Sequence, residues 1–175
     1  VKEFMGEGVD KEVRDAVSAA VDDLKSRGID IVEVSIPSID LALACYYIIV
    51  PAEISSNLSR YDGQRYGFSK PDANDLEGSY SSSRGIGFNA ENKRRIMIGT
   101  YVLSSGYYDA YYKKAALLRT KLINEVNKAF EEVDFLIGPV APITAPKVGE
   151  NADDPLKMYL MDLMTVPISL CGIPA

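Results

Sequence analysis

The stretch that decides the predicted fold class is residues 10–37, which reads DKEVRDAVSAAVDDLKSRGIDIVEVSIP. Asp10 can cap a helix through its side-chain oxygen, and Gly28 can end it. Residues 29–36 are rich in β-branched side chains and stop at Pro37, which predicts a strand. A helix followed by a strand indicates an α/β protein. Apolar residues at helical spacing predict one buried stripe on the helix, formed by Val13, Ala16, Val17, Ala20, Val21 and Leu24.

The remaining elements follow from the same reading of apolar spacing and chain breaks. Five glycines and a run of three serines predict irregular structure over residues 60–92. We find no internal repeat, and we predict that residues 1–175 form one partial domain. The other expected elements are a mostly apolar helix over 39–58 interrupted at Pro51, helices over 91–103, 107–132 and 156–165, and a short buried strand over 133–138.

The composition is that of an ordinary globular protein, with 47% hydrophobic and 25% charged residues among 175. The net charge of -6 argues against a nucleic-acid binder that acts through its overall charge. The chain contains no histidine, which excludes Ser-His-Asp and Cys-His catalytic arrangements and histidine metal sites within these residues. Two distant cysteines, Cys45 and Cys171, fit a reduced, intracellular setting.

The two ends of the chain look cut rather than finished. The first residue is Val1, no secretory signal follows it, and the last residues, 171–175, are apolar with no polar tail. No uninterrupted apolar run reaches the roughly 20 residues of a membrane helix. We therefore expect an internal fragment of a longer cytoplasmic enzyme with no membrane association.

Arg95 is the first candidate for a binding residue. On the predicted helix it shares a face with Gly99, whose missing side chain is expected to leave room beside the guanidinium. The planar fork of arginine suits a carboxylate, because it binds both oxygens. A helix-surface arginine in a weak ion pair explains the same pattern. Arg94 is the main rival for the role.

Asp162 is the second candidate. It is the only charged residue in the apolar segment 158–166, and a buried carboxylate must find donors or a cation. It can bind an ammonium group, or it can lie on a wet helix edge or pair with an internal lysine. Together, Arg95 and Asp162 can hold the two ends of a free α-amino acid, provided that they lie close in space.

Other features are weaker candidates. The serine clusters at 81–83 and 104–105 lack a histidine base and any strong signature, so loop and helix-break roles explain them better than a Ser-Lys pair. The paired tyrosines at 107–108 and 111–112 are expected to be core and interface aromatics rather than a base-stacking platform. Residues 84–121 hold eight Lys/Arg and two acids, so a net +6 there either faces an anionic partner or is a solvated helix surface.

Several long strings resemble the amidase-signature family, and within it the A subunits of glutamyl-tRNA(Gln) amidotransferases. The similarity extends over nearly the whole chain, and strings of this length are specific. The strings are YYIIVPAEISSNL at 46–58, RYDGQRYG at 60–67, KRRIMIGTYVLSSGYYDAYYKKA at 93–115, GPVAP at 138–142 and DPL at 154–156.

The resemblance implies a fold and an activity. The fold is a mixed β-sheet covered by α-helices. Such a subunit hydrolyses glutamine to glutamate and ammonia, and the ammonia reaches a B subunit that uses ATP and Mg to amidate glutamyl-tRNA(Gln), while a small C subunit joins A and B. In some organisms the complex acts on aspartyl-tRNA(Asn). No cofactor is implied in this chain. The family's Ser-Ser-Lys triad is expected upstream of Val1, so the fragment alone should be inactive.

The resemblance also implies substrate-binding residues. Arg95 matches the arginine for the glutamine α-carboxylate, and Asp162 the aspartate for the α-amino group. Tyr46 or Tyr47 matches a pocket tyrosine. Two alternatives remain open at this point: a general amidase of the same family, and a non-catalytic scaffold or RNA-contacting module.

Overall fold

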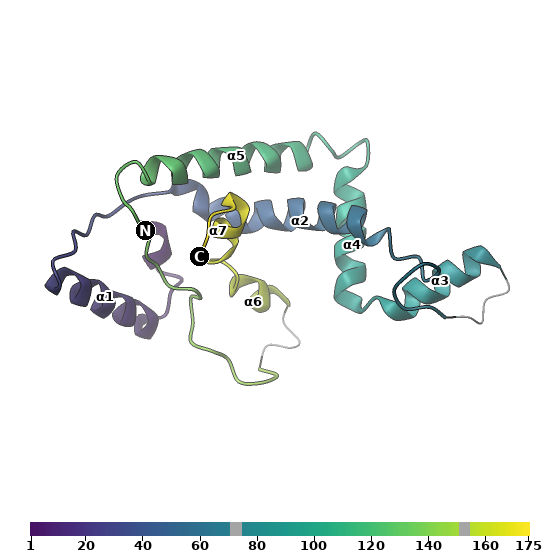
Figure 1. Cartoon of the computed structure of the whole chain (residues 1–175), viewed down its shortest axis with the longest axis horizontal. Coiled ribbons are helices and arrows are strands. Elements are labelled where there is room, and N and C mark those ends of the chain that lie inside the picture. Colours follow the sequence, from purple (N-terminus) through teal and green to yellow (C-terminus); the bar gives the residue numbers. More distant parts are fainter. Residues whose placement is uncertain (71–74, 151–154) are drawn as a thin grey trace. The chain divides into compact units, whose positions relative to one another are not determined.

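The computed structural model describes residues 1–70, 75–150 and 155–175, and it divides into two compact units (Figure 1). Unit 1 consists of Val1–Tyr46 and Leu117–Ala175, and unit 2 of Tyr47–Ala116. The helices are η1 (Lys2–Met5), α1 (Lys11–Ser26), η2 (Pro37–Leu41), α2 (Ala42–Leu58), α3 (Leu76–Gly87), α4 (Ala90–Leu103), α5 (Tyr112–Ala129), α6 (Pro155–Leu160) and α7 (Val166–Cys171), of which η1 and η2 are 3-10 helices.

Most of the predicted helices are confirmed, with corrections at their ends. The Asn89 side chain caps α4 by accepting a hydrogen bond from the Asn92 N–H at 2.8 Å. Asp10 precedes α1, but its carboxylate makes no capping hydrogen bond. Pro51 lies inside α2 without ending it, and the predicted helix over 156–165 is only the short α6, followed by a turn over 161–165.

The structure contains a helix, α3, that the sequence did not predict. Residues 76–87 form α3 despite their glycines and serines, because Asp75 caps the helix by accepting from the Gly78 N–H at 2.6 Å. The prediction of irregular structure throughout 60–92 is therefore wrong. A capping aspartate before a segment without proline was the available signal.

The two predicted strands are wrong as secondary structure, because the described residues contain none. Residues 29–36 keep the strand-like alternation at their end, where Val34 and Ile36 are buried and Ser35 is exposed. Apolar alternation needs a neighbouring strand to become a strand, and in the described part of the chain the main-chain N–H that bonds the Val34 carbonyl is that of Lys2 at 3.0 Å, which lies in the 3-10 helix η1. The mixed sheet is thus not confirmed in this chain.

Unit 1 has a core in which η2 meets α5. Ile36, Leu122 and Val126 are each about 1% exposed. The Glu125 carboxylate accepts hydrogen bonds from the main-chain N–H and the hydroxyl of Ser38, both at 2.9 Å, and so satisfies the start of η2. Along α5 the buried residues are Ala115, Leu122, Val126 and Ala129. The buried stripe predicted for the helix after Asp10 is wrong, because none of the residues of α1 is fully buried.

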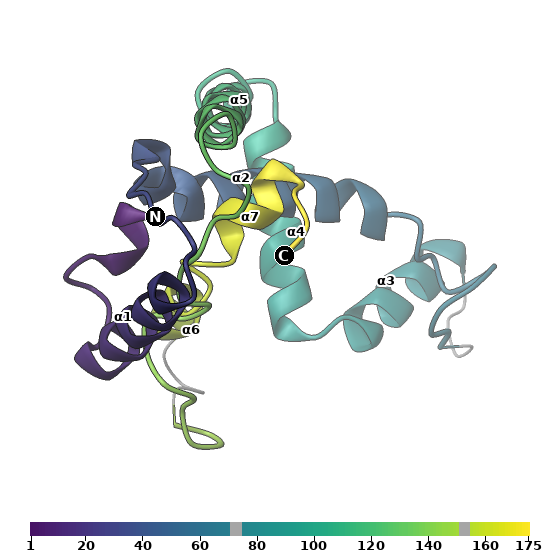
Figure 2. The same cartoon turned by 60° about the vertical axis from the view of Figure 1, so that its left-hand side comes forward.

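Unit 2 depends on a close crossing of α4 over α2, which Figures 1 and 2 show from two directions. A Cβ atom built on Gly99 would lie 1.9 Å from the carbonyl oxygen of Pro51 and 2.7 Å from the Ser55 hydroxyl. The two helix backbones therefore touch at a position where only glycine fits.

Among the described residues one helical stretch, Pro37–Leu58, is long and apolar enough by length and composition alone to cross a membrane, although Asp40 and Glu53 interrupt its apolar residues. Core helices of soluble proteins pass the same test. The apolar composition here includes a stripe of buried residues at intervals of three and four, namely Ile39, Ala42, Cys45, Ile49 and Ala52.

Gly99→Ala is expected to destabilise the protein by about 1–3 kcal/mol, the usual cost of overpacking, because the new methyl group overlaps the Pro51 carbonyl. Urea unfolding midpoints measure the change. Gly85→Ala on α3 is the matched control: no heavy atom lies within 4 Å of its added Cβ, so stability should stay equal or rise slightly. Equal midpoints for the two variants would contradict the close crossing.

Candidate functional site

Arg95 is held in place on α4 by an acid and an aromatic ring. Its Nε donates to the Glu91 carboxylate at 2.9 Å, and its guanidinium carbon lies 5.6 Å from the centroid of the Tyr47 ring. The side chain is 21% exposed. Glu91 also pairs with Arg94, so one carboxylate holds both arginines. The structure thus contains the i,i+4 ion pair that was the alternative explanation, and it adds a contact with an aromatic face. The binding of a ligand carboxylate by Arg95 stays a prediction.

The structure corrects the role of Gly99. We expected its missing side chain to leave room beside the guanidinium, but the α2 backbone at Pro51 fills that space. Gly99 instead permits the helix crossing. Sequence reasoning also missed Glu91, although an acid four residues before an arginine is a recognisable helical pair.

Of the two tyrosine candidates, Tyr47 is the one that lies against Arg95 within unit 2. Tyr46 precedes it on α2, points about 100° away around the helix and belongs to unit 1. Both side chains are half-buried. The role of each in substrate binding stays a prediction.

Asp162 lies in the turn after α6, and it is exposed rather than buried in a helix. The main chain around it is well ordered by hydrogen bonds: the N–H groups of Thr165 and Val166 donate to the Asp162 carbonyl at 3.2 and 3.0 Å. Its carboxylate is accessible to a cationic ligand. Arg95 and Asp162 belong to different units, so their convergence on one ligand stays a prediction.

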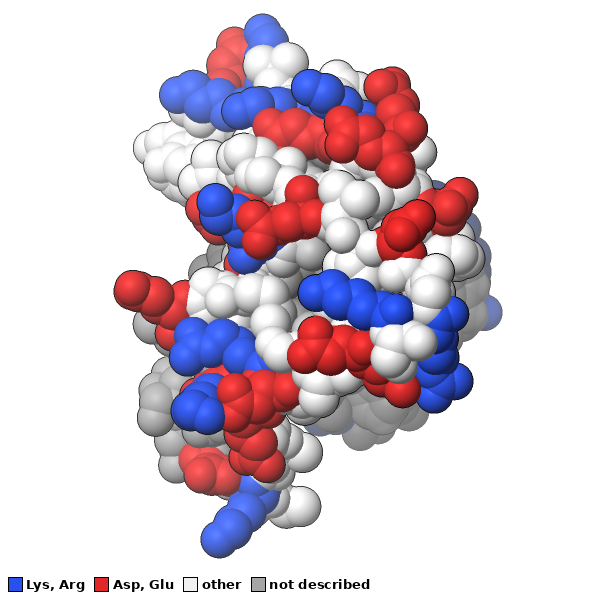
Figure 3. All heavy atoms as spheres, turned by 90° about the vertical axis from the view of Figure 1, so that its left-hand side faces the viewer, with Lys and Arg blue, Asp and Glu red and all other residues white. Residues whose placement is uncertain are grey.

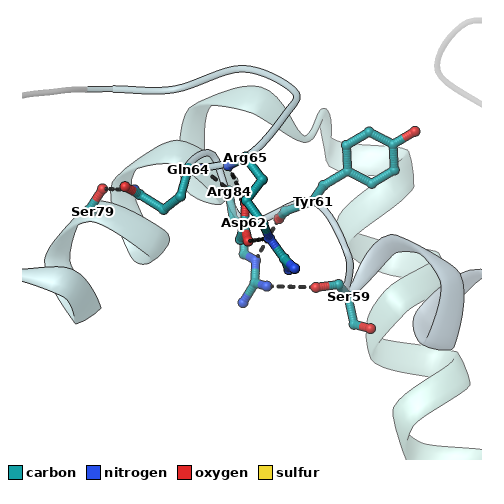
Figure 4. A network of polar contacts seen from close by, with 7 residues as sticks. All are labelled: Ser59, Tyr61, Asp62, Gln64, Arg65, Ser79 and Arg84. Atoms are coloured by element: carbon teal, nitrogen blue, oxygen red, sulfur yellow. Dashed lines mark hydrogen bonds and ion pairs between the residues drawn. The ribbon is translucent and has the colours of Figure 1, made fainter.

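The RYDGQRYG string forms a tight turn organised around Asp62 (Figure 4). One carboxylate oxygen accepts from the main-chain N–H groups of Gln64 at 2.9 Å and Arg65 at 3.1 Å, and the other accepts from the Arg65 Nε at 3.0 Å. The side chain is only 9% exposed. These N–H donors, first Gln64 and then Arg65, lower the pKa of Asp62 to about 2, because they stabilise the charged form.

Arg84 of α3 ties this turn to its neighbours. Its Nε and one terminal nitrogen donate to the main-chain carbonyls of Tyr61 at 3.0 Å and Ser59 at 2.9 Å. Gly63 has a φ of 72°, and a Cβ there would lie 2.6 Å from the buried Ser83. The Asp62-Gly63 pair is a common turn signal in sequence, and it is the signal that could have identified this turn.

A pocket of about 320 Å³ opens beside the turn. Its apolar wall comes from Leu58, Tyr61, Phe68 and Phe88, and its polar groups include Ser83, Arg84 and Asn92. All of these residues belong to unit 2. The volume lies at the lower end of the range for pockets that bind small molecules or single side chains.

The serines and cysteines behave as structural groups. The Ser83 hydroxyl accepts from the main-chain N–H of Lys70 at 3.0 Å, and the Ser104 hydroxyl donates to the Tyr101 carbonyl at 2.7 Å. Burial raises the pKa of the Cys45 and Cys171 thiols, which opposes thiolate chemistry. Across the described ranges, no cluster of three or more acidic or cysteine side chains is placed to bind a metal.

None of the paired tyrosines is a core residue: Tyr107, Tyr108 and Tyr111 are exposed, and Tyr112 is half-buried. The rings of Tyr101, Tyr107 and Tyr111 form a triangle with centroids 4.2–6.1 Å apart, and Tyr108 stacks on Tyr112 at 5.3 Å. Hydrogen bonding with Tyr107 raises the pKa of Tyr101 to about 12. The Tyr101 phenol is therefore neutral at physiological pH.

The sequence model of the amidase family matches residues 1–175, the whole chain. The chain belongs to the amidase family. The resemblance identified from the sequence is thereby confirmed at the level of the family.

Curated relatives of this amidase-family chain carry a more specific name. It is 54%, 53% and 50% identical to proteins from Brevibacillus brevis, Nostoc punctiforme and Staphylococcus haemolyticus, each named as the A subunit of glutamyl-tRNA(Gln) amidotransferase. The alignments cover 99%, 100% and 99% of this chain, respectively, and 36% of each relative. The chain thus spans about a third of the length of these relatives.

Asp62→Asn is expected to lower stability most near neutral pH. The pKa of about 2 for Asp62 in the folded protein lies below the value of about 3.9 for an unfolded aspartate. The charged carboxylate therefore contributes its full stabilisation of the folded protein above about pH 4, and this contribution is lost as the pH falls toward 2. The difference in urea midpoint between wild type and variant should therefore narrow as pH falls from 5 to 2.

Asp109→Asn serves as the control, because the exposed Asp109 carboxylate meets only the Lys113 ammonium, at 3.3 Å. It should change stability little at any pH. A difference for Asp62→Asn that stays constant down to pH 2 would contradict the hydrogen-bonded carboxylate.

Proposed function

We propose that this chain is the substrate-binding part of a glutaminase subunit in a tRNA-dependent amidotransferase. The observation that carries the proposal is the identity of 50–54% over nearly the whole chain to proteins named as that subunit. The proposed reaction converts glutamine and water to glutamate and ammonia. The ammonia then serves a B subunit, which uses ATP and Mg to convert Glu-tRNA(Gln) to Gln-tRNA(Gln).

Arg95 is the proposed partner of the glutamine α-carboxylate. A guanidinium presents a planar set of N–H donors that matches two carboxylate oxygens. The bond to Glu91 and the contact with Tyr47 hold its orientation before a ligand arrives, which reduces the entropy lost on binding.

Asp162 is the proposed partner of the α-amino group, and Tyr46 or Tyr47 completes the pocket. The exposed Asp162 carboxylate is accessible to an ammonium ion. A cation and an anion that together bind a zwitterion select free α-amino acids over simple amides. This clamp requires the two units to bring Arg95 and Asp162 to one cavity.

The nucleophile belongs, in this proposal, to the two thirds of the relatives' length that the chain does not match. There a lysine would take the proton of the nucleophilic serine through a second serine, and the serine oxygen would attack the side-chain amide carbon of glutamine. The C–N bond would then break, ammonia would leave with that proton, and water would hydrolyse the remaining acyl-enzyme to glutamate and free serine. We therefore expect the 175-residue chain by itself to hydrolyse no glutamine. In the longer protein, segments 29–36 and 133–138 would find the partners that a mixed sheet requires.

The proposed assembly is a cytoplasmic heterotrimer of A, B and C subunits. The main alternative is a general amidase of the same family, which needs no clamp for both ends of an amino acid. A scaffold or RNA-contacting role is less well supported. The net charge is -6, and the face drawn in Figure 3 has acidic and basic side chains interspersed rather than a continuous basic surface.

Asp162→Ala in the full-length protein should abolish glutamine-driven transamidation and leave ammonia-driven transamidation unchanged, because only glutamine needs the α-amino contact. Asp22→Ala, which removes an exposed carboxylate from α1, is the control and should affect neither reaction. Loss of both reactions, or of neither, would rule out the proposed role of Asp162.

Arg95→Lys should raise the KM for glutamine about tenfold or more, because lysine cannot bind both carboxylate oxygens as the arginine fork does. A tenfold change corresponds to a loss of only about 1.4 kcal/mol of binding free energy. Arg94→Lys is the matched control, since both arginines pair with Glu91. Steady-state glutaminase assays of the two variants measure the KM for glutamine and so decide which arginine binds the α-carboxylate. A larger KM change in Arg94→Lys would transfer the carboxylate role to Arg94.

A further inference from the structure

Tyr47 lies against the side chain that we propose to bind the α-carboxylate of glutamine. The guanidinium carbon of Arg95 is over the Tyr47 ring, 5.6 Å from its centroid, and both residues belong to unit 2. An arginine within about 6 Å of a ring centroid is attracted by the ring face, and the attraction grows as water is excluded. The Arg95 side chain is only 21% exposed, so the ring is a substantial part of its surroundings.

The backbone of unit 2 fixes the ring beside the guanidinium. Tyr47 lies four residues before Pro51 on α2. Arg95 lies four residues before Gly99 on α4. The two helices touch at Pro51 and Gly99, because a Cβ on Gly99 would lie 1.9 Å from the Pro51 carbonyl oxygen (Figure 2). The ring and the guanidinium are thus each one helical turn from a close backbone contact, which keeps them together.

The hydroxyl of Tyr47 is withdrawn from solvent. The Tyr47 Oη is buried, and the residue as a whole is half-buried. A tyrosine that recognises a ligand by hydrogen bonding has to present its hydroxyl to that ligand. What Tyr47 presents at the proposed carboxylate site is its ring, to Arg95. The geometry therefore favours an action through the ring.

The Tyr47 ring and the Glu91 carboxylate restrain different motions of the guanidinium. Glu91 accepts a hydrogen bond from the Arg95 Nε at 2.9 Å, on the edge of the guanidinium, and so limits rotation within the guanidinium plane. A ring over the face limits tilting of that plane. A carboxylate ligand binds the edge through two parallel N–H···O bonds. The ring therefore orients the guanidinium without occupying the position of the ligand.

We propose that Tyr47 is a positioning residue, whose ring sets the plane in which Arg95 binds the α-carboxylate of glutamine and whose hydroxyl does not touch the substrate. The inference rests on the proposed function, because the role of Arg95 does. It removes Tyr47 from the candidates for direct contact with glutamine. A guanidinium held in one plane loses less conformational entropy when the carboxylate binds, so the ring acts on the affinity for glutamine.

The test measures the KM for glutamine with the full-length protein in its amidotransferase complex. Tyr47→Leu removes the ring and should raise this KM about fivefold, the scale of a half-buried arginine–aromatic contact, while ammonia-driven transamidation stays unchanged. Tyr47→Phe keeps the ring and should restore the wild-type KM. Tyr80→Leu is the matched control and should leave the KM unchanged, because it removes a ring whose centroid is 5.5 Å from the Arg84 guanidinium carbon elsewhere in unit 2.

A double-mutant cycle determines whether Tyr47 acts through Arg95. Arg95→Ala removes the guanidinium, so a ring that acts only through it has nothing left to orient. Tyr47→Leu should therefore cause no further loss of kcat/KM for glutamine in the Arg95→Ala protein. A loss equal to the one in the wild-type protein would mean that Tyr47 contacts the substrate independently, and it would overturn the proposal.

Other outcomes overturn the proposal as well. A raised KM for Tyr47→Phe assigns the contact to the hydroxyl, and an unchanged KM for Tyr47→Leu leaves the ring without a role. Loss of ammonia-driven transamidation together with the glutamine-driven reaction indicates a structural role. If Tyr47→Leu does not fold, Tyr47→Met gives the same comparison, because its flexible side chain fills irregular space without offering a ring face.

The proposed function has a separate readout in the same assay. Absence of glutaminase activity in the wild-type complex refutes the proposed function, and the inference about Tyr47 falls with it. An active wild-type complex whose KM for glutamine does not respond to loss of the ring refutes the inference alone.

Discussion

The contact between the Gly99 backbone and the Pro51 carbonyl is the constraint on which unit 2 depends. Because the helices touch there, the residues one turn before the contact on each helix are brought together, which places Arg95 against the ring of Tyr47. Glu91, another turn earlier on α4, then holds the guanidinium. A packing requirement therefore positions the group that we propose to bind substrate.

A second set of contacts in unit 2 holds the turn around Asp62. Asp62 organises its turn with main-chain hydrogen bonds, and Arg84 attaches that turn to α3. Both charged groups are used to hold backbone rather than to meet a ligand. The rings of Tyr66 and Phe68 on the same turn remain exposed.

The amidase family membership gives these features a common context. The chain matches about a third of the length of its named relatives. Its sequence contains no histidine, and the described residues contain no group of three or more acidic or cysteine side chains that could hold a metal.

Local sequence determined the helices α1, α4 and α5, because apolar spacing and a capping asparagine act within a few residues. It also identified the family to which the chain belongs. It named Arg95 as a candidate carboxylate-binding residue, a role that stays a prediction. Tertiary structure decided the rest. Residues 29–36 have strand-like composition but form no strand, because a strand exists only with a hydrogen-bonded neighbour. Gly99 makes room for a helix rather than for a ligand, because only the fold shows which group approaches a missing side chain.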